Sequence, residues 1–441
     1  TKHGPIISDI YPGDSLVGDQ VISMQWTGHT VSYEIEALLG INWATSFSQF
    51  KQQLPKFNVP GQHFIYGDLV GNIGLFSAAS IPLRAYNPIL PRKGWDPSYD
   101  WQGYLPHDEL PRIINPESGY LANANNKLSV ADNEHYLATF WEPESRFQRI
   151  DQILSNADSL RIDDFALMQN DNFSHHAKFV AETILPVLRA ENRDSRFDIA
   201  ISYLENWNYM YEPNATAATI MDMFFVKLTK NTLLDEVGEE AYEQFIRIEN
   251  IPIRTITHLL KNSSLTLLFD NSKTEEIIET RRDIITKSME ETLEELAQTF
   301  GTETYEWRWE QLHTVTIEPP LLGRAAKAPD TSKALQLIVK NVLSVGPDPA
   351  PGHSQSINSM QYQWSDPYHV TNGPSIRRIV DFSDLSRTYS VTPTGQSGRP
   401  LSEHFGDQFE MWLNGEYKYL YQDSTLFNRA YIQNMHLRPG N

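Results

Sequence analysis

Residues 60–84 read PGQHFIYGDLVGNIGLFSAASIPLR, which describes a strand, a tight turn, a second strand and a proline-stiffened exit. Aromatic and β-branched residues form the first strand, and the second resumes at Ile73. Between the two, Gly71 can adopt the positive φ that a tight reversal needs. The pattern predicts an antiparallel hairpin.

Two nitrogen-rich side chains mark the ends of this hairpin. His63 lies at the mouth of the first strand, and Arg84 lies just past the second. Asp68 and Asn72 are expected to fix the turn and not to touch a ligand. The residues alone leave two interpretations open: an ordinary hairpin with solvated ends, or a site that uses an imidazole and a guanidinium.

The composition excludes several classes of protein. With 441 residues the chain can bury a large core in two or three domains or one large multilayer unit. Its 36 basic and 56 acidic residues give a net charge of −20, and no Lys/Arg cluster is dense enough to bind nucleic acid. The sequence contains no run of about 18 apolar residues, which is the length that a membrane-spanning helix needs. The absence of cysteine excludes disulfides, thiolate chemistry and cysteine zinc sites.

The order of patterns along the chain predicts an α+β protein. Residues 1–145 mix strands, short helices and a long irregular loop over 86–130, whose aromatic residues are expected to pack against the body. Residues 146–300 have helical periodicity. Residues 301–441 are expected to be mostly β and to return to a sheet begun in the first third.

The clearest single helix is expected from about Lys273 to Phe300. Ser272 and Glu275 have the spacing of a capping box, and Gly301 ends the pattern. Apolar residues at helical spacing form one stripe along it. The charged remainder is interpreted as a solvated face.

Two motifs suggest chemistry but are better explained by structure. Residues 352–356 (GHSQS) come near a nucleophile elbow, but the final glycine is missing and a proline-rich loop surrounds them, so we interpret them as a turn. His175 and His176 are adjacent, so on a helix their side chains point about 100° apart and rarely share one metal ion. A solvated helix face is the favoured interpretation, and no metal ligand set is assigned.

The hairpin also resembles a segment of the penicillin acylase (penicillin amidase) family. That segment has an asparagine, two apolar residues, a tyrosine, a small residue, an aspartate, a turn, Gly-Asn-Ile-Gly and later Pro-x-Arg. Further blocks resemble the same family, in order, over nearly the whole chain. They are residues 1–7 (TKHGPII), 94–95 (GW), 100–106 (DWQGYLP), 114–126 (INPESGYLANANN), 169–171 (QND), 373–381 (GPSIRRIVD), 395–398 (GQSG) and 404–408 (HFGDQ) with Trp412.

The resemblance implies part of an N-terminal nucleophile (Ntn) hydrolase, a four-layer αββα sandwich with a large helical insertion. Such a protein is made as one precursor that cuts itself into a small and a large chain. The N-terminal serine of the large chain then attacks an amide carbonyl, and its own α-amine, with a pKa of about 8, serves as the base. This chemistry needs no cofactor. The family often binds a structural calcium ion, whose ligands the sequence does not assign.

At one implied catalytic position the chain departs from the family pattern. In the family a backbone N–H and the asparagine side chain hold the tetrahedral oxyanion, and here the aligned residue is His63. A neutral imidazole donates one N–H, so His63 is either a pH-sensitive oxyanion donor or a plain structural donor in a member with changed chemistry or none. Arg84 keeps the family's arginine, which is expected to orient the donor.

The resemblance also implies that more polypeptide takes part. The block at Thr1 matches an internal strand of the large chain, so the nucleophilic serine is expected in a segment that precedes it. The expected partners are this missing N-terminal part of the large chain, the small chain and a small-molecule N-acyl amide. Thr1 stays an alternative nucleophile, because N-terminal threonine serves in other hydrolases of this class.

These inferences predict a penicillin acylase-like amidohydrolase that cleaves a linear amide with an apolar acyl group through an acyl-enzyme. The 441 residues alone are expected to be inactive. Penicillins, acyl-homoserine lactones and lipopeptides all stay open as substrates. The resemblance further implies autoproteolytic processing, antibiotic metabolism and a periplasmic or secreted location. The alternative is a non-catalytic member or fragment that acts as a binding or structural module.

Overall fold

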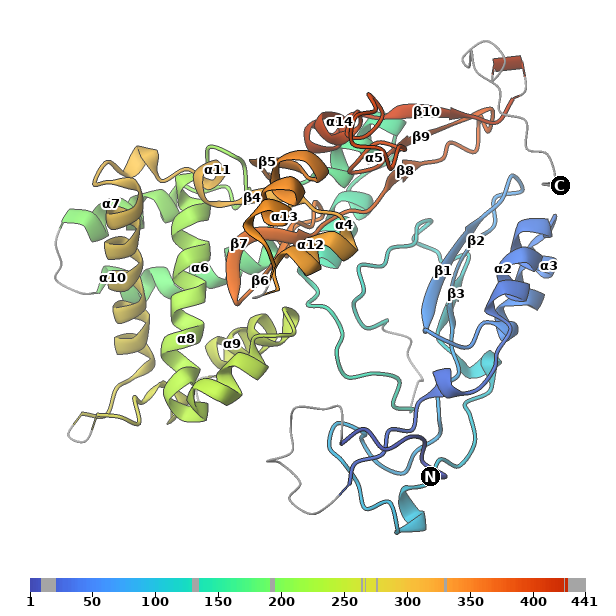
Figure 1. Cartoon of the computed structure of the whole chain (residues 1–441), viewed down its shortest axis with the longest axis horizontal. Helices are drawn as coiled ribbons and strands as arrows, with labels where there is room; N and C mark the ends of the chain where they lie inside the picture. Colours follow the sequence, from blue (N-terminus) through green and yellow to red (C-terminus); the bar gives the residue numbers. More distant parts are fainter. Residues whose placement is uncertain are drawn as a thin grey trace. The chain divides into compact units, whose positions relative to one another are not determined.

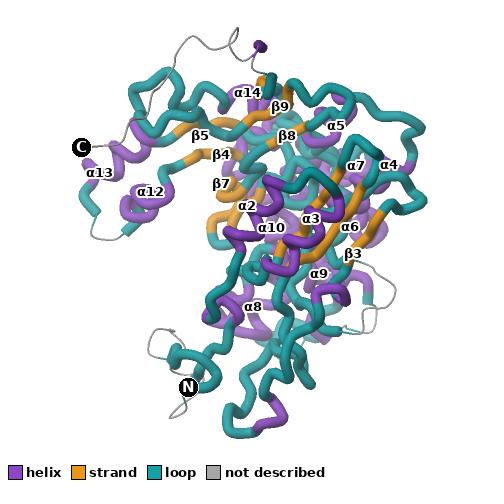
Figure 2. Tube along the Cα trace, turned by 90° about the vertical axis from the view of Figure 1, so that its right-hand side faces the viewer, coloured by secondary structure: helices purple, strands orange, loops and turns teal. Residues whose placement is uncertain are grey.

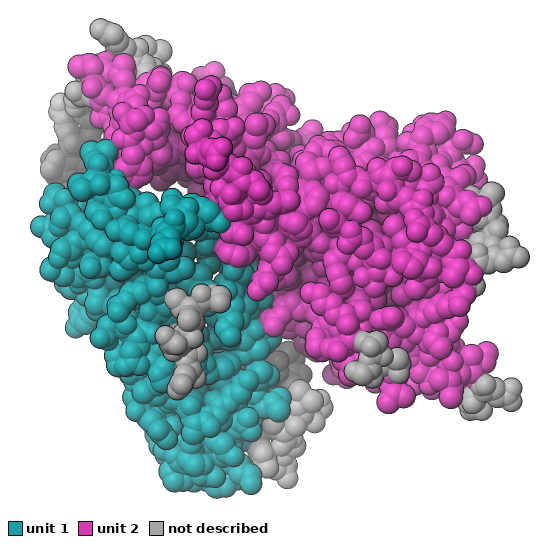
Figure 3. Space-filling model, turned by 180° about the vertical axis from the view of Figure 1, so that it is seen from behind, with its two compact units in different colours: residues 1–142 teal, residues 143–441 magenta. Residues whose placement is uncertain are grey.

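The structure is a computed structural model that describes residues 1–8, 21–128, 135–190, 195–262, 265, 267–274, 277–328, 331–423 and 425–426. The chain divides into two compact units, Thr1–Glu142 and Pro143–Asn441, which Figure 3 colours separately. Each unit is described below by itself. Together their helices and sheets confirm the predicted α+β class.

A three-stranded antiparallel sheet forms the centre of the first unit. Its strands are β1 (Gln62–Gly67), β2 (Ile73–Ala78) and β3 (Arg112–Ile114), in the order β1-β2-β3. The predicted hairpin is therefore confirmed, and His63 pairs with Ser77 in its register. The short strand β3 arises from the stretch that was expected to be irregular throughout.

The turn of the hairpin is held by the carboxylate of Asp68. Its Oδ1 accepts hydrogen bonds from the backbone N–H groups of Val70 and Asn72, and its Oδ2 accepts from the Asn72 amide and the Tyr66 hydroxyl. These bonds, the Asn72 amide first, lower the pKa of Asp68. Gly71 has a φ of 94°, as the reversal requires. The predicted structural role of Asp68 and Asn72 is confirmed.

Two helices pack on the sheet, α2 (Glu34–Trp43) and α3 (Phe47–Gln53) (Figure 1). Ser46 caps α3 by accepting a hydrogen bond from the backbone N–H of Gln49. The rings of Phe47 and Phe50 lie within 6 Å of those of Tyr66 and Phe76 on the hairpin. This aromatic cluster anchors α3 against the sheet and buries Phe50 and Phe76.

The rest of the first unit is mostly loop, drawn in teal in Figure 2. Its short 3₁₀ helices are η1 (Thr27–His29), η2 (Leu54–Lys56), η3 (Pro97–Tyr99) and η4 (His107–Glu109). Near the N-terminus a single antiparallel bridge joins Ile6 to Ser23. Residues 102–105 pair by backbone hydrogen bonds with residues 81–83, so part of the long loop packs down as predicted.

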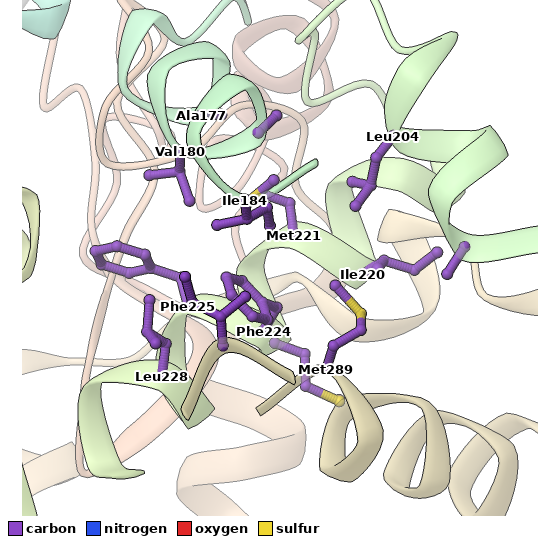
Figure 4. Packing of buried hydrophobic residues seen from close by; sticks show 14 of the residues in the cluster. Ala177, Val180, Ile184, Leu204, Ile220, Met221, Phe224, Phe225, Leu228 and Met289 are labelled. Carbon is purple, nitrogen blue, oxygen red and sulfur yellow. The ribbon is translucent and has the colours of Figure 1, made fainter. Parts of the chain in front are cut away.

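The second unit begins with a helical region. Its helices are α4 (Ser145–Ser155), α5 (Ile162–Gln169), α6 (His175–Arg189), α7 (Ser195–Glu205), α8 (Thr216–Phe245), α9 (Asn250–Lys261), η5 (Leu267–Phe269), α10 (Arg281–Phe300), η6 (Thr304–Glu306) and α11 (Trp309–Leu312). The first half of α8 is buried on all sides, which marks it as the central helix. Figure 4 shows Phe224, Phe225 and Leu228 of α8 packed with Ile184 of α6 and Met289 of α10.

The predicted helix over residues 273–300 is correct in its end and wrong in its start. Gly301 follows the last turn with a φ of 88°, as expected. The helix begins only at Arg281, where Thr280 and Asp283 form the capping box. Ser272 instead binds Asp235 of α8 through its backbone N–H and its hydroxyl, which holds it outside the helix.

The last part of the chain forms two further sheets. The first, in the order β5-β4-β7-β6, contains β4 (Thr314–Ile317), β5 (Val345–Pro349), β6 (Gln361–Gln363) and β7 (Asp366–Asn372). The second, in the order β10-β9-β8, contains β8 (Arg377–Ile379), β9 (Arg387–Val391) and β10 (Lys418–Tyr421). The accompanying helices are α12 (Pro320–Ala326), α13 (Lys333–Ile338), the π-helix η7 (Val339–Leu343) and α14 (Phe409–Asn414).

The described strands of the last third pair with one another in these two sheets. The predicted return of the last third to the first sheet stays a prediction. A further strand expected near Tyr431 lies outside the described residues. In the described part of the chain, no helix is both long enough and apolar enough to cross a membrane.

Polar contacts join the separate sequence blocks of the second unit. Gln169 donates to the backbone carbonyl of Arg378 over 3.0 Å and accepts from the hydroxyl of Tyr417 over 2.7 Å. The buried guanidinium of Arg377 donates to Asn358 over 2.7 Å. The blocks near residues 169, 377 and 412 are thus used to hold this unit together.

Candidate functional site

The two predicted site residues, His63 and Arg84, line one pocket of the first unit. The pocket has a volume of about 450 Å³. His63 comes from strand β1, and Arg84 follows the exit from β2. The structure therefore brings together the imidazole and the guanidinium that the hairpin pattern suggested. Their catalytic roles stay predictions.

The wall of this pocket is largely apolar. Three indole rings contribute to it, those of Trp26, Trp101 and Trp141, together with Leu128 and Leu137. Trp101 lies in the loop whose aromatics were expected to pack down, whereas the sequence gave no reason to expect Trp141 here. A concave apolar wall with few polar groups is typical of a small-molecule site.

His63 is half-buried and fixed by two neighbours. Its Nδ1 lies 3.1 Å from Oγ of Ser77, its register partner on β2. Its ring lies nearly parallel to that of Trp141, at an angle of 15° with the centroids 6.5 Å apart. Burial lowers the pKa of His63, because removal from water disfavours the charged imidazolium. The ring is therefore neutral at pH 7.

A neutral His63 carries one proton, and Ser77 decides how it is used. When the Ser77 hydroxyl donates to Nδ1, the proton lies on Nε2, which forms no hydrogen bond with the described residues. In that tautomer Nε2–H can donate to a ligand. When Nδ1 donates to Ser77, Nε2 is an acceptor instead. The site can therefore supply one directed N–H, as an oxyanion donor requires.

Arg84 is also half-buried and is held by an aromatic ring. The centre of its guanidinium lies 5.2 Å from the centroid of the Trp101 ring. Burial is the main cause that lowers its pKa, while Tyr86 and Tyr136 act in the opposite direction. No carboxylate among the described residues forms an ion pair with Arg84, so its positive charge is available to the pocket.

Thr1 is not among the described residues that line this pocket. Its hydroxyl donates to the carbonyl of Gly4 over 3.0 Å and accepts from the backbone N–H of His3. In the described residues no group of three His, Asp or Glu side chains is arranged to hold a metal ion. The structural calcium ion implied by the resemblance stays a prediction.

A second polar cluster is buried in the second unit. Asp222 of α8 lies 2.8 Å from Nε2 of His353 through one carboxylate oxygen and accepts from the Tyr362 hydroxyl, also over 2.8 Å, through the other. Nδ1 of His353 accepts from the backbone N–H of Gln355 over 3.3 Å, so Nε2 carries the proton. The ring of Tyr211 stacks on His353 with the centroids 4.4 Å apart.

This cluster is best explained as a structural network. The adjoining cavity of about 10 Å³ has room for roughly one water molecule. Neither Ser354 nor Ser356 is hydrogen-bonded to the His353 ring in the described structure, and the Ser356 hydroxyl donates to backbone carbonyls instead. Residues 352–356 form a buried loop, which confirms the predicted turn. The described residues thus contain no serine–histidine–aspartate arrangement here.

The prediction of a solvated face at the paired histidines is wrong for His176. Helix α6 begins at His175, after Ser174 caps it, and this start turns His176 inward. Its Nε2 lies 3.1 Å from the hydroxyl of Thr257, and its ring meets Phe225 edge-on. Burial lowers the pKa of His176 to about 3. This histidine is a satisfied core residue and no metal ligand.

Sequence reasoning missed the network around Asp222. One signal was present: Asp222 is a single carboxylate within the apolar run of residues 217–228. A charged residue within such a run needs a buried partner. The partner, His353, lies 131 positions away and could not be named from spacing alone.

Comparison with known proteins adds a family and a fold. The sequence pattern of the family described as penicillin amidase matches residues 1–426. A relative described as the acyl-homoserine lactone acylase QuiP of Pseudomonas aeruginosa is 27% identical over 346 residues, which cover 75% of this chain and 40% of that protein. The penicillin acylase 2 proenzyme of Pseudomonas sp. strain SE83 is 31% identical over 179 residues, which cover 40% of this chain and 22% of that protein.

The chain spans about half the length of the curated relatives it matches. Among solved structures, the thermostable penicillin G acylase of Alcaligenes faecalis is similar with a TM-score of 0.70. The match covers 100% of this chain and 78% of that chain at 18% identity, so it shows the fold alone. The expected Ntn-hydrolase fold is thereby confirmed.

Proposed function

Because the chain belongs to the penicillin amidase family, we propose that the complete protein hydrolyses a linear amide that carries an apolar acyl group. The observation that carries this proposal is the shared pocket of His63 and Arg84. It combines an apolar wall of acyl-chain dimensions with one directed N–H and one positive charge. These are the features that an acyl-transfer site needs from this part of the protein.

The nucleophile is a serine outside these 441 residues, at the start of the mature large chain. Its Oγ attacks the amide carbonyl and forms a C–O bond, while its own α-amine takes the hydroxyl proton. The C–N bond then breaks, and the amine leaves with that proton. Water hydrolyses the acyl-enzyme and releases the acid. The greater length of the relatives supports this division of the site between segments.

His63 supplies the side-chain donor of the oxyanion hole. Its Nε2–H donates to the carbonyl oxygen as that oxygen gains negative charge in the tetrahedral intermediate. A donor in this position typically contributes about 3–4 kcal/mol to transition-state stabilisation. Arg84, over the ring of Trp101, adds a positive charge to the same pocket and favours the oxyanion over the neutral carbonyl.

The substrate is an N-acyl compound with an apolar acyl chain, since indole and leucine side chains dominate the wall. Relatives are described as acylases of acyl-homoserine lactones and of penicillin, and both kinds of compound carry such an amide. Self-processing into two chains, a small-chain partner and a periplasmic or secreted location belong to the same proposal. The alternative, a non-catalytic member, is favoured only by His63 in place of the family's asparagine.

One experiment tests this proposal in the complete protein. Hydrolysis of a chromogenic phenylacetyl amide and of an N-acyl-homoserine lactone is measured for the natural protein, His63→Ala and His63→Asn. We expect His63→Ala to lower kcat by about a hundredfold or more. His63→Asn restores the family's donor and should retain most of the activity. An inactive natural protein whose His63→Asn variant is active would instead identify a member that lost its chemistry at this residue.

A further inference from the structure

A second pocket of the first unit is lined by basic side chains. It has a volume of about 250 Å³ and lies between helix α3, the short helix η4 and strand β3. Lys51 comes from α3, His107 from η4 and Arg112 from β3. Three separate segments of a strongly acidic chain therefore direct their nitrogen-bearing side chains to one place.

The cations of this pocket have no acidic partner in the described part of the chain. No carboxylate of the described residues forms an ion pair with Lys51 or Arg112. Among the described residues, the Lys51 ammonium contacts the ring of Phe47, at 4.7 Å from the centroid. The full sequence has 56 acidic residues and 36 Lys and Arg, so cations left unpaired side by side need an explanation.

The remaining wall complements these cations. Ser48 lies three residues before Lys51 and four before Gln52 on α3, and Ser48 and Gln52 add a hydroxyl and an amide donor to the pocket. The apolar part of the wall is formed by buried residues. They are Leu54, Phe76 and Leu110.

We propose that this pocket binds a small organic anion, whose carboxylate or phosphate group contacts Lys51 and Arg112 and whose apolar part lies against Leu54, Phe76 and Leu110. A guanidinium donates two parallel N–H groups to a carboxylate or phosphate, and a lysine ammonium adds a point charge. The apolar wall distinguishes such a ligand from an inorganic ion.

The net charge of −20 does not prevent this binding. At physiological ionic strength, charges further than about 8 Å away are largely screened. The ligand therefore responds mainly to the cations that line the pocket. Added salt should weaken its binding, since these side chains are exposed or half-buried.

His107 makes the pocket dependent on pH. Burial lowers its pKa, Arg112 lowers it further, and Asp108 acts in the opposite direction. Lys51, which lines the same pocket, adds a further positive charge. His107 is therefore neutral at pH 7.5 and gains a charge below its ordinary pKa, and a bound anion favours that charge. Affinity should rise as the pH falls from 7.5 to 5.5.

Isothermal titration calorimetry of the complete protein tests the proposal with hexanoate, inorganic phosphate and, as an uncharged comparison, hexanol. The variant Lys51→Gln/Arg112→Gln removes both cations of the pocket. The matched control Lys93→Gln/Arg399→Gln removes two exposed cations elsewhere and changes the net charge equally. We expect hexanoate to bind the natural protein and the control alike, and the pocket variant at least about tenfold more weakly.

The outcomes decide both the site and the ligand class. Phosphate that binds more tightly than hexanoate, and loses affinity in the pocket variant, would assign a phosphorylated ligand. The proposal would be overturned if hexanoate and phosphate each bound the pocket variant as tightly as the control. It would also be overturned if hexanol bound the natural protein as tightly as hexanoate does. The result does not depend on the proposed hydrolase function, because binding is read directly and neither His63 nor Arg84 lines this pocket.

Discussion

Oγ of Ser77 lies 3.1 Å from Nδ1 of His63, and the two residues form one register pair of the β1–β2 hairpin. The strand pairing fixes their separation, so the hydroxyl orients the imidazole without a loop or a water molecule between them. When its hydroxyl donates to Nδ1, Ser77 is a positioning residue, because it then keeps the His63 proton on Nε2, where the proposed oxyanion donor needs it.

Replacement of Ser77 tests that role. In Ser77→Ala the ring can carry its proton on either nitrogen, so fewer molecules present Nε2–H to the substrate. Loss of one hydrogen bond, at about 1.4 kcal/mol, corresponds to about a tenfold lower kcat. KM should stay nearly constant, because the bond acts on the transition state. Ser98→Ala, at an exposed serine of the same unit, is the control, and a change in KM alone would contradict the assignment.

The contact of the Arg84 guanidinium with the Trp101 ring gives a second prediction. Arg84→Lys keeps the charge but replaces the planar guanidinium with an ammonium, which the Trp101 ring positions less well. We expect a severalfold loss of kcat/KM in Arg84→Lys and a loss of about tenfold or more in Arg84→Gln. Amide hydrolysis by the complete protein measures both. Equal activity of natural protein and Arg84→Gln would remove the charge from the mechanism.

Two buried histidines make the stability of the second unit sensitive to acid. Burial lowers the pKa of His176 to about 3 and that of His313 to about 4. In the unfolded chain their pKa values return to about 6.5, so below that pH the unfolded state binds more protons. Stability present above pH 6.5 is thus lost as the pH falls towards 4 and then 3. Each histidine contributes a slope of up to about 1.4 kcal/mol per pH unit.

Urea unfolding between pH 7.5 and 5.0 measures this slope in a range where carboxylates titrate little. In His313→Gln the free energy of unfolding should change less steeply with pH, by about the slope that one histidine contributes. This holds whatever the substitution does to stability at pH 7.5. His404→Gln is the comparison, since His404 is exposed beside Asp407. A dependence that His313→Gln leaves unchanged would show that this imidazole does not control acid unfolding.

The buried carboxylate of Asp222 gives a stability prediction. Asp222→Ala leaves the His353 Nε2–H and the Tyr362 hydroxyl without their acceptor, and we expect a loss of about 3–5 kcal/mol. Asp222→Asn keeps the shape and one acceptor oxygen, while its amide can donate to the Tyr362 oxygen. Asp222→Asn should therefore lower the free energy of unfolding clearly less than Asp222→Ala does. Urea unfolding separates the two, and equal losses would argue that volume and not hydrogen bonding holds the cluster.

The start of α10 can be tested against the alternative that the sequence suggested. Thr280→Ala removes the observed cap and should cost about 1 kcal/mol. Ser272→Ala removes one exposed hydrogen bond to the Asp235 carbonyl and should cost about half of that or less. Thermal unfolding of both variants decides, and a larger loss in Ser272→Ala would favour the earlier start.

Local patterns predicted the elements that local interactions fix. The β1–β2 hairpin depends on its own turn, where Gly71 and Asp68 act within five residues, and the sequence was sufficient there. The predicted start of α10 was wrong because the sequence offers two capping boxes within twelve residues. The two N-cap residues, Ser272 and Thr280, are eight positions apart, and the choice between them depends on Ser272 binding Asp235 of another helix, which spacing along the chain does not reveal.

The residues of the candidate site likewise divide into those that the sequence predicted and those that it did not. His63 and Arg84 were identified because they lie at the ends of one recognisable hairpin. Trp141 was not, because it comes from a segment that reaches the pocket only in three dimensions. The solvated interpretation of His176 failed for a similar reason, since its burial depends on Thr257, 81 residues away. Long-range packing, not local propensity, decided these cases.

Every described wall residue of the His63 pocket comes from residues 25–141, within one compact unit, whereas the buried histidine network comes from the other. A chimaera that exchanges residues 1–142 with a relative would therefore transfer the whole described wall in a single crossover and leave the network of the second unit with its own partners. The boundary between Glu142 and Pro143 is thus the natural recombination point for exchanging the wall of the His63 pocket without rebuilding the core of the second unit.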